Sequence, residues 1–203
     1  GRYEHPLSVV SAALWDKYNG HKYVKDVWVL ERRVDERGRL HSRRLLTMLG
    51  SMPKVFAPIF GNKPFHLVED IVVDLQSEKM EVRTRNINFV SMLDSSAESV
   101  YRPSAQDPSW TDYDISVRTS AFPGQDQSRM STWGIGRRLE EFVAGRLLGN
   151  IKQGEQVISD YVRMLRHACY SGEANVYLCR DVVRDRQLRP PHTHWGDEKK
   201  QKI

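Results

Sequence analysis

Hydrophobic and polar positions along this chain change their period near residue 132. Before that point apolar residues mostly alternate with polar ones, a pattern typical of half-buried β-strands. From residue 132 to about residue 169 they recur every three or four residues, which predicts one long amphipathic helix. A shorter run with four-residue spacing, Val10, Leu14 and Tyr18, predicts a helix near the N-terminus that stops at Asn19-Gly20.

The alternating part of the chain divides into several strands joined by short polar links. We expect six strands, at residues 23–34, 39–47, 65–74, 79–89, 92–101 and 111–121. The link between the first two is "DERG", in which Gly38 is placed to adopt a positive φ. Consecutive strands with short links form an antiparallel meander. The sequence therefore predicts one α+β domain in which a twisted antiparallel sheet and a long C-terminal helix enclose a volume between them.

One apolar segment fits neither period. Between Met52 and Phe60 the chain is apolar except for Lys54, and Pro53 and Pro58 make a continuous strand or a long straight helix unfavourable. Such a segment could act as a lid that covers an apolar ligand when closed and enters a membrane interface when open. Its candidate lid and membrane-contact residues are Met52, Val55, Phe56, Ile59 and Phe60. The alternative is a short helix packed permanently on the core.

Two adjacent arginines occupy the second expected strand. Because neighbouring side chains on a strand point to opposite faces, one of Arg43 and Arg44 must face the side covered by the helix. Arg44 shares its face with Leu40 and Leu46, so we expect Arg44 to point inward.

The long helix carries polar residues in a similar position. Arg146 and Asn150 fall within or beside its apolar stripe, and Lys152 lies on the flank. A buried cation without a partner costs several kcal/mol, so these residues call for an anion, and arginine suits a phosphate or carboxylate. The alternatives are an outward-bent guanidinium or an internal partner, for which the candidates are Glu69, Asp70 and Glu81.

Charge and cysteine content narrow the function classes. The net charge is +5, but residues 180–203 contribute three of those charges, and a body of about +2 argues against a nucleic-acid binder. Cys169 and Cys179 fit no zinc spacing, so they are expected to be free thiols or one late disulfide bridge. We find no catalytic motif, and "HTH" at 192–194 with Asp197 does not make a convincing metal site. We expect no metal, no cofactor and no enzymatic activity.

Several short motifs, taken in order, resemble the PRELI/Slowmo lipid-transfer domain of the mitochondrial intermembrane space. They are "HP", "WDKY", "RLHSRRLLT", "GSMP", "EDIVVD", "RTRNINFVSML", "ESVYRP", "QDP", "LEEF" and "GRLLGNIKQG". The resemblance covers roughly residues 5–168 and is nearest the Slowmo branch. Residues 1–170 are therefore expected to form the lipid-transfer domain, and 171–203 a charged and partly disordered tail.

The resemblance implies a fold and a cargo. It implies a helix-grip fold related to the steroidogenic-acute-regulatory lipid carriers: a curved antiparallel sheet of about seven strands, a short N-terminal helix, an Ω-type lid and a gripping C-terminal helix. It implies transfer of an acidic glycerophospholipid, phosphatidylserine or phosphatidic acid, between the outer and inner mitochondrial membranes. The head-group residues that carry over are Lys17, Arg44, Arg146, Asn150 and Lys152.

The resemblance also implies a partner, a small helical protein with paired cysteine motifs. Met48 and Ser51 stand where phosphatidic-acid carriers of the family have basic residues, which favours the Slowmo-like cargo. A lipid-binding sensor of the same fold that does not transfer its ligand is the alternative function. On this interpretation, Arg44→Glu should abolish transfer and leave the fold intact.

Overall fold

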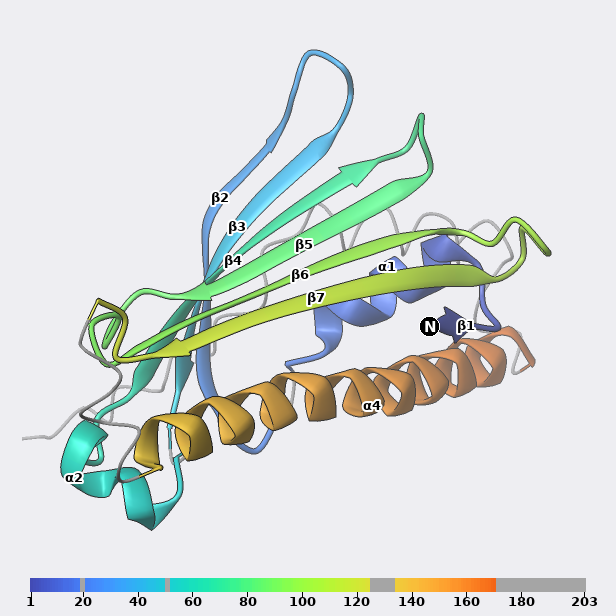
Figure 1. Cartoon of the computed structure of the whole chain (residues 1–203). Coiled ribbons are helices and arrows are strands. Elements are labelled where there is room, and N and C mark those ends of the chain that lie inside the picture. The colour runs from blue at the N-terminus through green and yellow to red at the C-terminus, as the bar shows by residue number, and fades with distance from the viewer. Residues whose placement is uncertain (19–20, 50–51, 125–133, 171–203) are drawn as a thin grey trace, which may run out of the picture.

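The protein folds around one seven-stranded antiparallel sheet. The computed structural model describes residues 1–18, 21–49, 52–124 and 134–170. The strands are β1 (Arg2–Tyr3), β2 (Val24–Val34), β3 (Leu40–Met48), β4 (Phe65–Asp74), β5 (Lys79–Asn86), β6 (Leu93–Pro103) and β7 (Thr111–Ala121). Their spatial order is β1-β7-β6-β5-β4-β3-β2, so β2 to β7 form the expected meander and the short β1 is added beside β7. The sheet is strongly curved (Figure 1).

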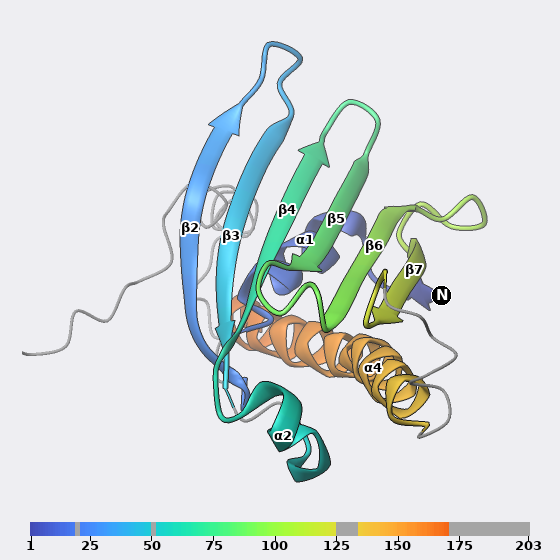
Figure 2. The same cartoon turned by 60° about the vertical axis from the view of Figure 1, so that its left-hand side comes forward.

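The two longer helices lie on the same side of the sheet. The helices are α1 (Leu7–Asp16), a 3-10 turn η1 (Lys54–Phe56), α2 (Ala57–Phe60) and α4 (Ile135–Tyr170). Figures 1 and 2 show α4 running along the face that α1 also covers, with α2 beyond one end of the sheet. Among the described residues, α4 rests mainly on β7 and on α1. No helix of this part of the chain is long and apolar enough to cross a bilayer.

The strands expected from the alternation are all present. The bounds of β4 and β7 agree with the prediction, and Gly38 in the β2–β3 turn has a φ of 77° as expected. The strand expected at 79–89 ends earlier, at Asn86, because the side-chain amide of Asn86 donates to the carbonyls of Asn88 and Leu93 and folds the chain back. Phe89 then has a positive φ of 60°, which lies outside the β region.

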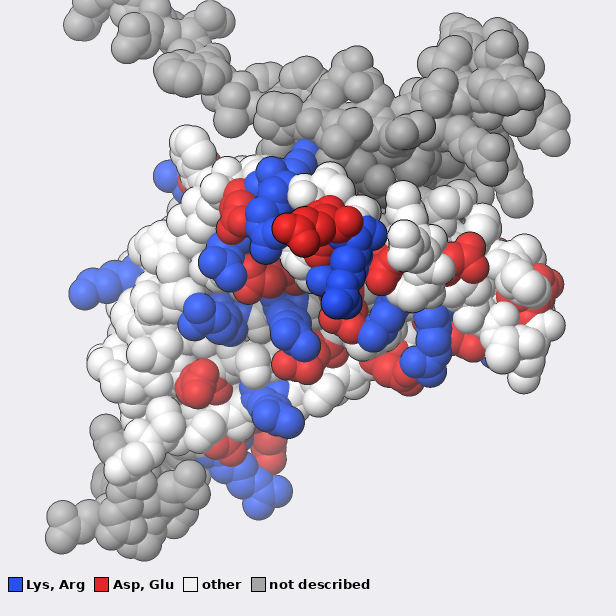
Figure 3. All heavy atoms as spheres, turned by 90° about the horizontal axis from the view of Figure 1, so that it is seen from above, with Lys and Arg blue, Asp and Glu red and all other residues white. Residues whose placement is uncertain are grey.

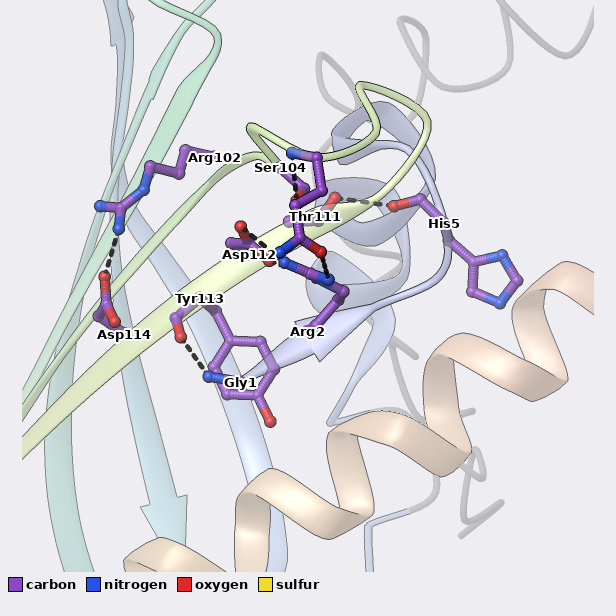
Figure 4. A network of polar contacts seen from close by, with 10 residues as sticks. Gly1, Arg2, His5, Arg102, Ser104, Thr111, Asp112, Tyr113 and Asp114 are labelled. Atoms are coloured by element: carbon purple, nitrogen blue, oxygen red, sulfur yellow. Dashed lines mark hydrogen bonds and ion pairs between the residues drawn. The ribbon is translucent and has the colours of Figure 1, made fainter.

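The first strand, β1, was not predicted, because two residues are too short for any periodic signal. Figure 4 shows how side chains fix it to β7: the guanidinium of Arg2 donates to the Asp112 carboxylate over 2.7 Å. The hydroxyl of Thr111 donates to the carbonyl of His5 over 2.8 Å, just before α1. These contacts close the β7 side of the sheet and anchor the start of α1.

Two hydrophobic clusters hold the helices on the sheet. The inner core includes Tyr3, Val10, Leu14, Ile71, Met80, Val82, Tyr101, Ile158 and Tyr161. The second cluster, here called the lid cluster, consists of Phe56, Phe60, Phe65, Leu93, Ala121, Phe122 and Leu139, with Phe89 and Phe142 packed against it. The inner core joins α1 and the C-terminal half of α4 to the sheet, and the lid cluster joins α2 to the N-terminal part of α4. The space between sheet and helix lies between these two clusters.

The outer face of the sheet is charged. Cross-strand neighbours form an alternating row, Glu31, Arg43, Asp70, Arg83 and Glu98, running across five strands. Figure 3 shows acidic and basic side chains interspersed on the surface seen from above Figure 1. Opposite charges placed directly across a sheet support the strand register and keep this face solvated. The interior between sheet and α4 is therefore the place to look for a binding site.

Candidate functional site

A partly open pocket lies between the sheet, α1 and α4. Its volume is about 120 Å³. The lining residues come from nearly every element: Tyr3, Leu14, Lys17, Tyr18, His21, Val24, Met48, Leu67, Val82, Thr84, Ala97, Ser99, Tyr101, Ile115, Val117, Leu147, Gly154 and Val157. Most of these side chains are apolar or aromatic, and the polar ones include Lys17, Tyr18 and His21, which come shortly after the end of α1. The pocket is thus an apolar chamber with a polar edge.

The pocket as it stands is smaller than a lipid. Pockets for drug-sized ligands have volumes of roughly 300–1,000 Å³, whereas this one has about 120 Å³. Several lining side chains, among them Met48, Leu67 and Val117, are only half buried, so the inner sheet face is not fully covered. A larger apolar ligand therefore needs more space between α4 and the sheet than this pocket provides.

Arg44 points inward from β3, as the sequence predicted, and is 3% exposed. Its register partner on β4 is Glu69, which is fully buried, and both guanidinium Nε and an Nη of Arg44 bond to one Glu69 oxygen, Oε1. The other Nη donates to the carbonyl of Trp15 over 3.1 Å. Of the three candidate partners named from the sequence, Glu69 is therefore the one chosen, because strand register places it opposite Arg44 on the inner face.

Two further groups complete this cluster. The ammonium of Lys17 and the hydroxyl of Tyr18 both donate to Glu69 Oε2, each over 2.8 Å. The Arg44 guanidinium also lies over the rings of Trp15 and Tyr18, at 5.0 and 5.3 Å from their centroids. We call Lys17, Tyr18, Arg44 and Glu69 the buried ion cluster. The end of α1 and the middle of two strands thus meet around a single carboxylate.

Electrostatics keep this cluster ionised. Burial by itself would raise the pKa of Glu69, but the charges of Arg44 and Lys17 and their hydrogen bonds outweigh it and lower the pKa to about 2. Burial and the Glu69 carboxylate raise the pKa of the Tyr18 hydroxyl well above its usual range, so Tyr18 stays a neutral donor. Burial also raises the pKa of Tyr101, on the pocket wall, to about 12. Glu69 is therefore an ionised carboxylate at neutral pH, held between the side chains of Lys17 and Arg44.

The structure describes the side chains of three of the five expected head-group residues, Lys17, Arg44 and Arg146. Lys17 and Arg44 lie together in the buried ion cluster, but only Lys17 also lines the pocket. The guanidinium of Arg146 lies 4.1 Å from the ring centroid of Tyr23 and 5.5 Å from that of Phe142. The side chains of Asn150 and Lys152 lie outside the described residues.

Tyr18 is the cluster member that sequence reasoning missed as a polar contact. It was assigned to the apolar stripe of the first helix from its spacing, whereas α1 ends at Asp16 and the Tyr18 hydroxyl reaches Glu69. The signal available in the sequence was the hydroxyl itself, because a tyrosine on a buried stripe usually has a hydrogen-bond partner for its hydroxyl.

The candidate lid segment forms η1 and α2 and packs on the core. Phe56 and Phe60 are buried, and their rings lie 5.9 Å from Phe142 and 5.2 Å from Phe65. Met52 and Ile59 are partly buried at the edge of the lid cluster, whereas Val55 is 68% exposed. The short-helix form of this segment was the alternative named from the sequence. Of the candidate lid residues, Val55 is the one that faces outward.

More apolar side chains are exposed at the same end of the sheet. Leu49 follows β3, and Ile87 and Val90 lie in the β5–β6 loop, with exposed fractions of 39%, 44% and 48%. The loop is fixed beside the lid, since Phe89 packs on Phe60 with ring centroids 5.4 Å apart. Exposed Lys54 and Lys63 flank α2. We call Leu49, Val55, Ile87 and Val90 the apolar tip.

A curved antiparallel sheet with one long helix on its inner face and an apolar pocket between them defines a helix-grip protein. The fold is that of the Zhui aromatase/cyclase from Streptomyces sp. R1128, with a TM-score of 0.51, 12% sequence identity, and coverage of 83% of this chain and 93% of that chain. At this identity the likeness concerns the fold alone.

The chain belongs to the PRELI-like family, whose model matches residues 8–168. It is 30% identical over 151 residues to PRELI domain-containing protein 1, mitochondrial, of Gallus gallus, covering 72% of this chain and 66% of that protein. The proteins of the same name from Bos taurus and Homo sapiens are each 30% identical over 147 residues, covering 70% of this chain and 63% of theirs.

These matches span slightly less than two thirds of the relatives' own lengths. The family and the fold class expected from the sequence are thereby confirmed. The relatives are named as mitochondrial proteins, which supports the mitochondrial location expected from the sequence.

Proposed function

We propose that this chain binds an acidic glycerophospholipid, phosphatidylserine or phosphatidic acid, between the sheet and α4 and transfers it between the outer and inner mitochondrial membranes. The observation that carries the proposal is the apolar pocket with Lys17 and Tyr18 at its edge, in a member of the PRELI-like family. An apolar chamber takes up acyl chains, and a cation with a hydroxyl replaces part of the hydration of a phosphate.

The energetics require such a chamber. The acyl chains of a diacyl lipid contain on the order of 30 methylene groups, and each costs ~0.8 kcal/mol when it leaves an apolar medium for water. A carrier must recover most of this cost, which a pocket of about 120 Å³ does not do. Loading therefore requires the chamber to widen at a membrane. The apolar tip, with Lys54 and Lys63 beside α2, is suited to contact an anionic bilayer surface while the lid opens.

The finer parts of the proposal rest on the sequence. They are the Slowmo-like assignment, the intermembrane space as the compartment, and a small helical partner with paired cysteine motifs. The cycle makes and breaks no covalent bond, so we propose a carrier and not an enzyme. Met48 lines the pocket in place of a basic residue, which supports a singly charged head group.

A transfer assay with matched variants tests the chamber. Leu147 of α4 lines the pocket, whereas its neighbour Leu148 is 53% exposed. Leu147→Trp should fill the chamber and lower transfer of fluorescent acidic phospholipid between vesicles by at least tenfold, and Leu148→Trp should leave it near the wild-type rate. Equal transfer by both variants would contradict binding in this space.

The alternative, a lipid sensor that does not transfer, is separated by a second measurement. Native mass spectrometry of protein purified from mitochondria should find one bound acidic phospholipid per chain. A lipid that co-purifies with the protein but never moves between vesicles would favour the sensor, and co-purification with the cysteine-rich partner tests that proposal independently.

A further inference from the structure

The buried ion cluster has an inner and an outer half. Arg44 and Glu69 are 3% and 0% exposed and do not line the pocket. Lys17 and Tyr18 belong to both places, since they bond to Glu69 and also line the pocket. A head group in the pocket therefore contacts Lys17 and Tyr18 directly. Arg44 lies behind these two residues and acts on the head group only through its charge.

The hydrogen-bonding capacity of the Glu69 carboxylate is fully occupied. A carboxylate accepts about four hydrogen bonds, and Glu69 receives two at Oε1 from Arg44 and two at Oε2, from Lys17 and Tyr18. An incoming phosphate would have to break this arrangement to reach Arg44, and that would leave Glu69 buried beside a second anion. Keeping the pair intact is the less costly arrangement.

The pair also sets the charge that the pocket presents. Lys17, Arg44 and Glu69 together carry one excess positive charge, because the carboxylate cancels one of the two cations. The two candidate lipids differ in the net charge of their head groups. A phosphate monoester such as that of phosphatidic acid has about −1.5 to −2 charges at pH 7, whereas a phosphodiester bearing a serine head group has a net charge of one negative unit.

We propose that Glu69 is a specificity-determining residue of the lipid site: by cancelling the charge of Arg44 it lowers the positive charge at the polar edge of the pocket by one unit and so favours phosphodiester head groups over a phosphate monoester. Arg44 is then a positioning residue, which acts through Glu69 and does not touch the lipid. The inference rests on the proposed lipid-transfer function and names the residue pair that sets its selectivity.

The test is a competition assay in which donor vesicles contain equal amounts of phosphatidic acid and phosphatidylserine. Glu69→Gln keeps the side-chain shape and adds one positive charge to the cluster, so the transfer ratio of phosphatidic acid to phosphatidylserine should rise about tenfold. The double variant Arg44→Met/Glu69→Gln restores one excess charge, so its ratio should return to the wild-type value. Glu98→Gln, on the exposed outer face, is the control and should leave the ratio unchanged.

Lys17→Met provides an independent variant that removes one donor to Glu69 Oε2 but keeps both bonds between Arg44 and Glu69 Oε1. It lowers the excess charge to zero, so the ratio should fall below the wild-type value even if Glu69→Gln does not fold. Circular dichroism of each variant restricts the comparison to folded protein.

Two results would overturn the inference: a ratio that is the same in wild type, Glu69→Gln and Lys17→Met, or a folded double variant that transfers no lipid, which would make Arg44 a direct ligand. Absence of transfer by the wild-type protein would instead overturn the proposed function.

Discussion

The contrast between the neighbouring Arg43 and Arg44 gives the sharpest prediction about stability. Arg44→Met removes the buried guanidinium and leaves Glu69 Oε1 with neither of its two donors, in a site with no exposure to water. Arg43→Met removes an ion pair to Asp70 on the outer face, where the two side chains are 51% and 37% exposed. The two substitutions are chemically identical and one residue apart, so they differ only in burial and partner.

The structure sets the expected magnitudes. Removing one partner of a buried ion pair costs about 3–5 kcal/mol, whereas an exposed pair contributes about 0–1 kcal/mol. The pKa of Glu69 leads to a similar figure: it falls from the ordinary value of 4.5 to about 2, and such a shift corresponds to about 3 kcal/mol at ~1.4 kcal/mol per pKa unit. Arg44→Met should therefore lower the free energy of unfolding at pH 7 by about 3–5 kcal/mol and Arg43→Met by less than about 1 kcal/mol.

The effect should depend on pH in a defined direction. Because the folded protein lowers the pKa of Glu69, this stabilisation is fully present above pH 4.5 and is lost as the pH falls toward 2. In Arg44→Met the charge that most strongly lowers the pKa of Glu69 is missing, so the variant lacks this stabilisation at every pH. The difference in free energy of unfolding between wild type and variant should therefore shrink as the pH falls from 4.5 toward 2. Urea denaturation followed by circular dichroism at pH 7 and at pH 3 measures both quantities. Equal losses for Arg43→Met and Arg44→Met at pH 7 would refute the assignment of Arg44 to a buried pair.

This geometry also changes one expectation drawn from the sequence. Arg44→Glu was expected to abolish transfer and leave the fold intact. With Glu69 fully buried opposite position 44, the substitution would place two carboxylates together without water, and loss of folding is the expected result. Lost activity in that variant would therefore say nothing about lipid contact.

Two further predictions concern the end of the sheet that carries the lid. Val55→Asp should weaken flotation of the protein with anionic liposomes by at least fivefold. The control is Val34→Asp, which is similarly exposed at the opposite end of the sheet and should not weaken flotation. Equal effects of the two substitutions would exclude the apolar tip as the membrane contact. Asn86→Ala removes three hydrogen bonds that hold the β5–β6 loop and should lower the free energy of unfolding by about 3 kcal/mol, with exposed Asn62→Ala as the control. A loss below about 1 kcal/mol would mean that the backbone alone fixes this loop.

Residue pattern alone predicted much of this protein. The alternating runs predicted six of the strands, the change of period predicted α4, and the face shared with Leu40 and Leu46 predicted that Arg44 points inward. These are local properties, because the side-chain period of a strand or helix follows from backbone geometry. The order of short motifs likewise indicated the family, whose model matches nearly the same span of the chain.

Only the tertiary structure decided what Arg44 meets. Glu69, Asp70 and Glu81 were equal candidates in the sequence, and strand register selected Glu69 by placing it on the inner face opposite Arg44, while Asp70 pairs with Arg43 outside. It also brought Lys17 to the same carboxylate across 52 residues of chain and placed the guanidinium of Arg146 over the ring of Tyr23. The period of a strand or helix predicts which way a side chain points. Which residue it contacts there depends on strand pairing and helix packing between segments that are distant in the sequence. The contacts of the buried ion cluster join distant segments, so they are determined by the tertiary structure and not by the local sequence.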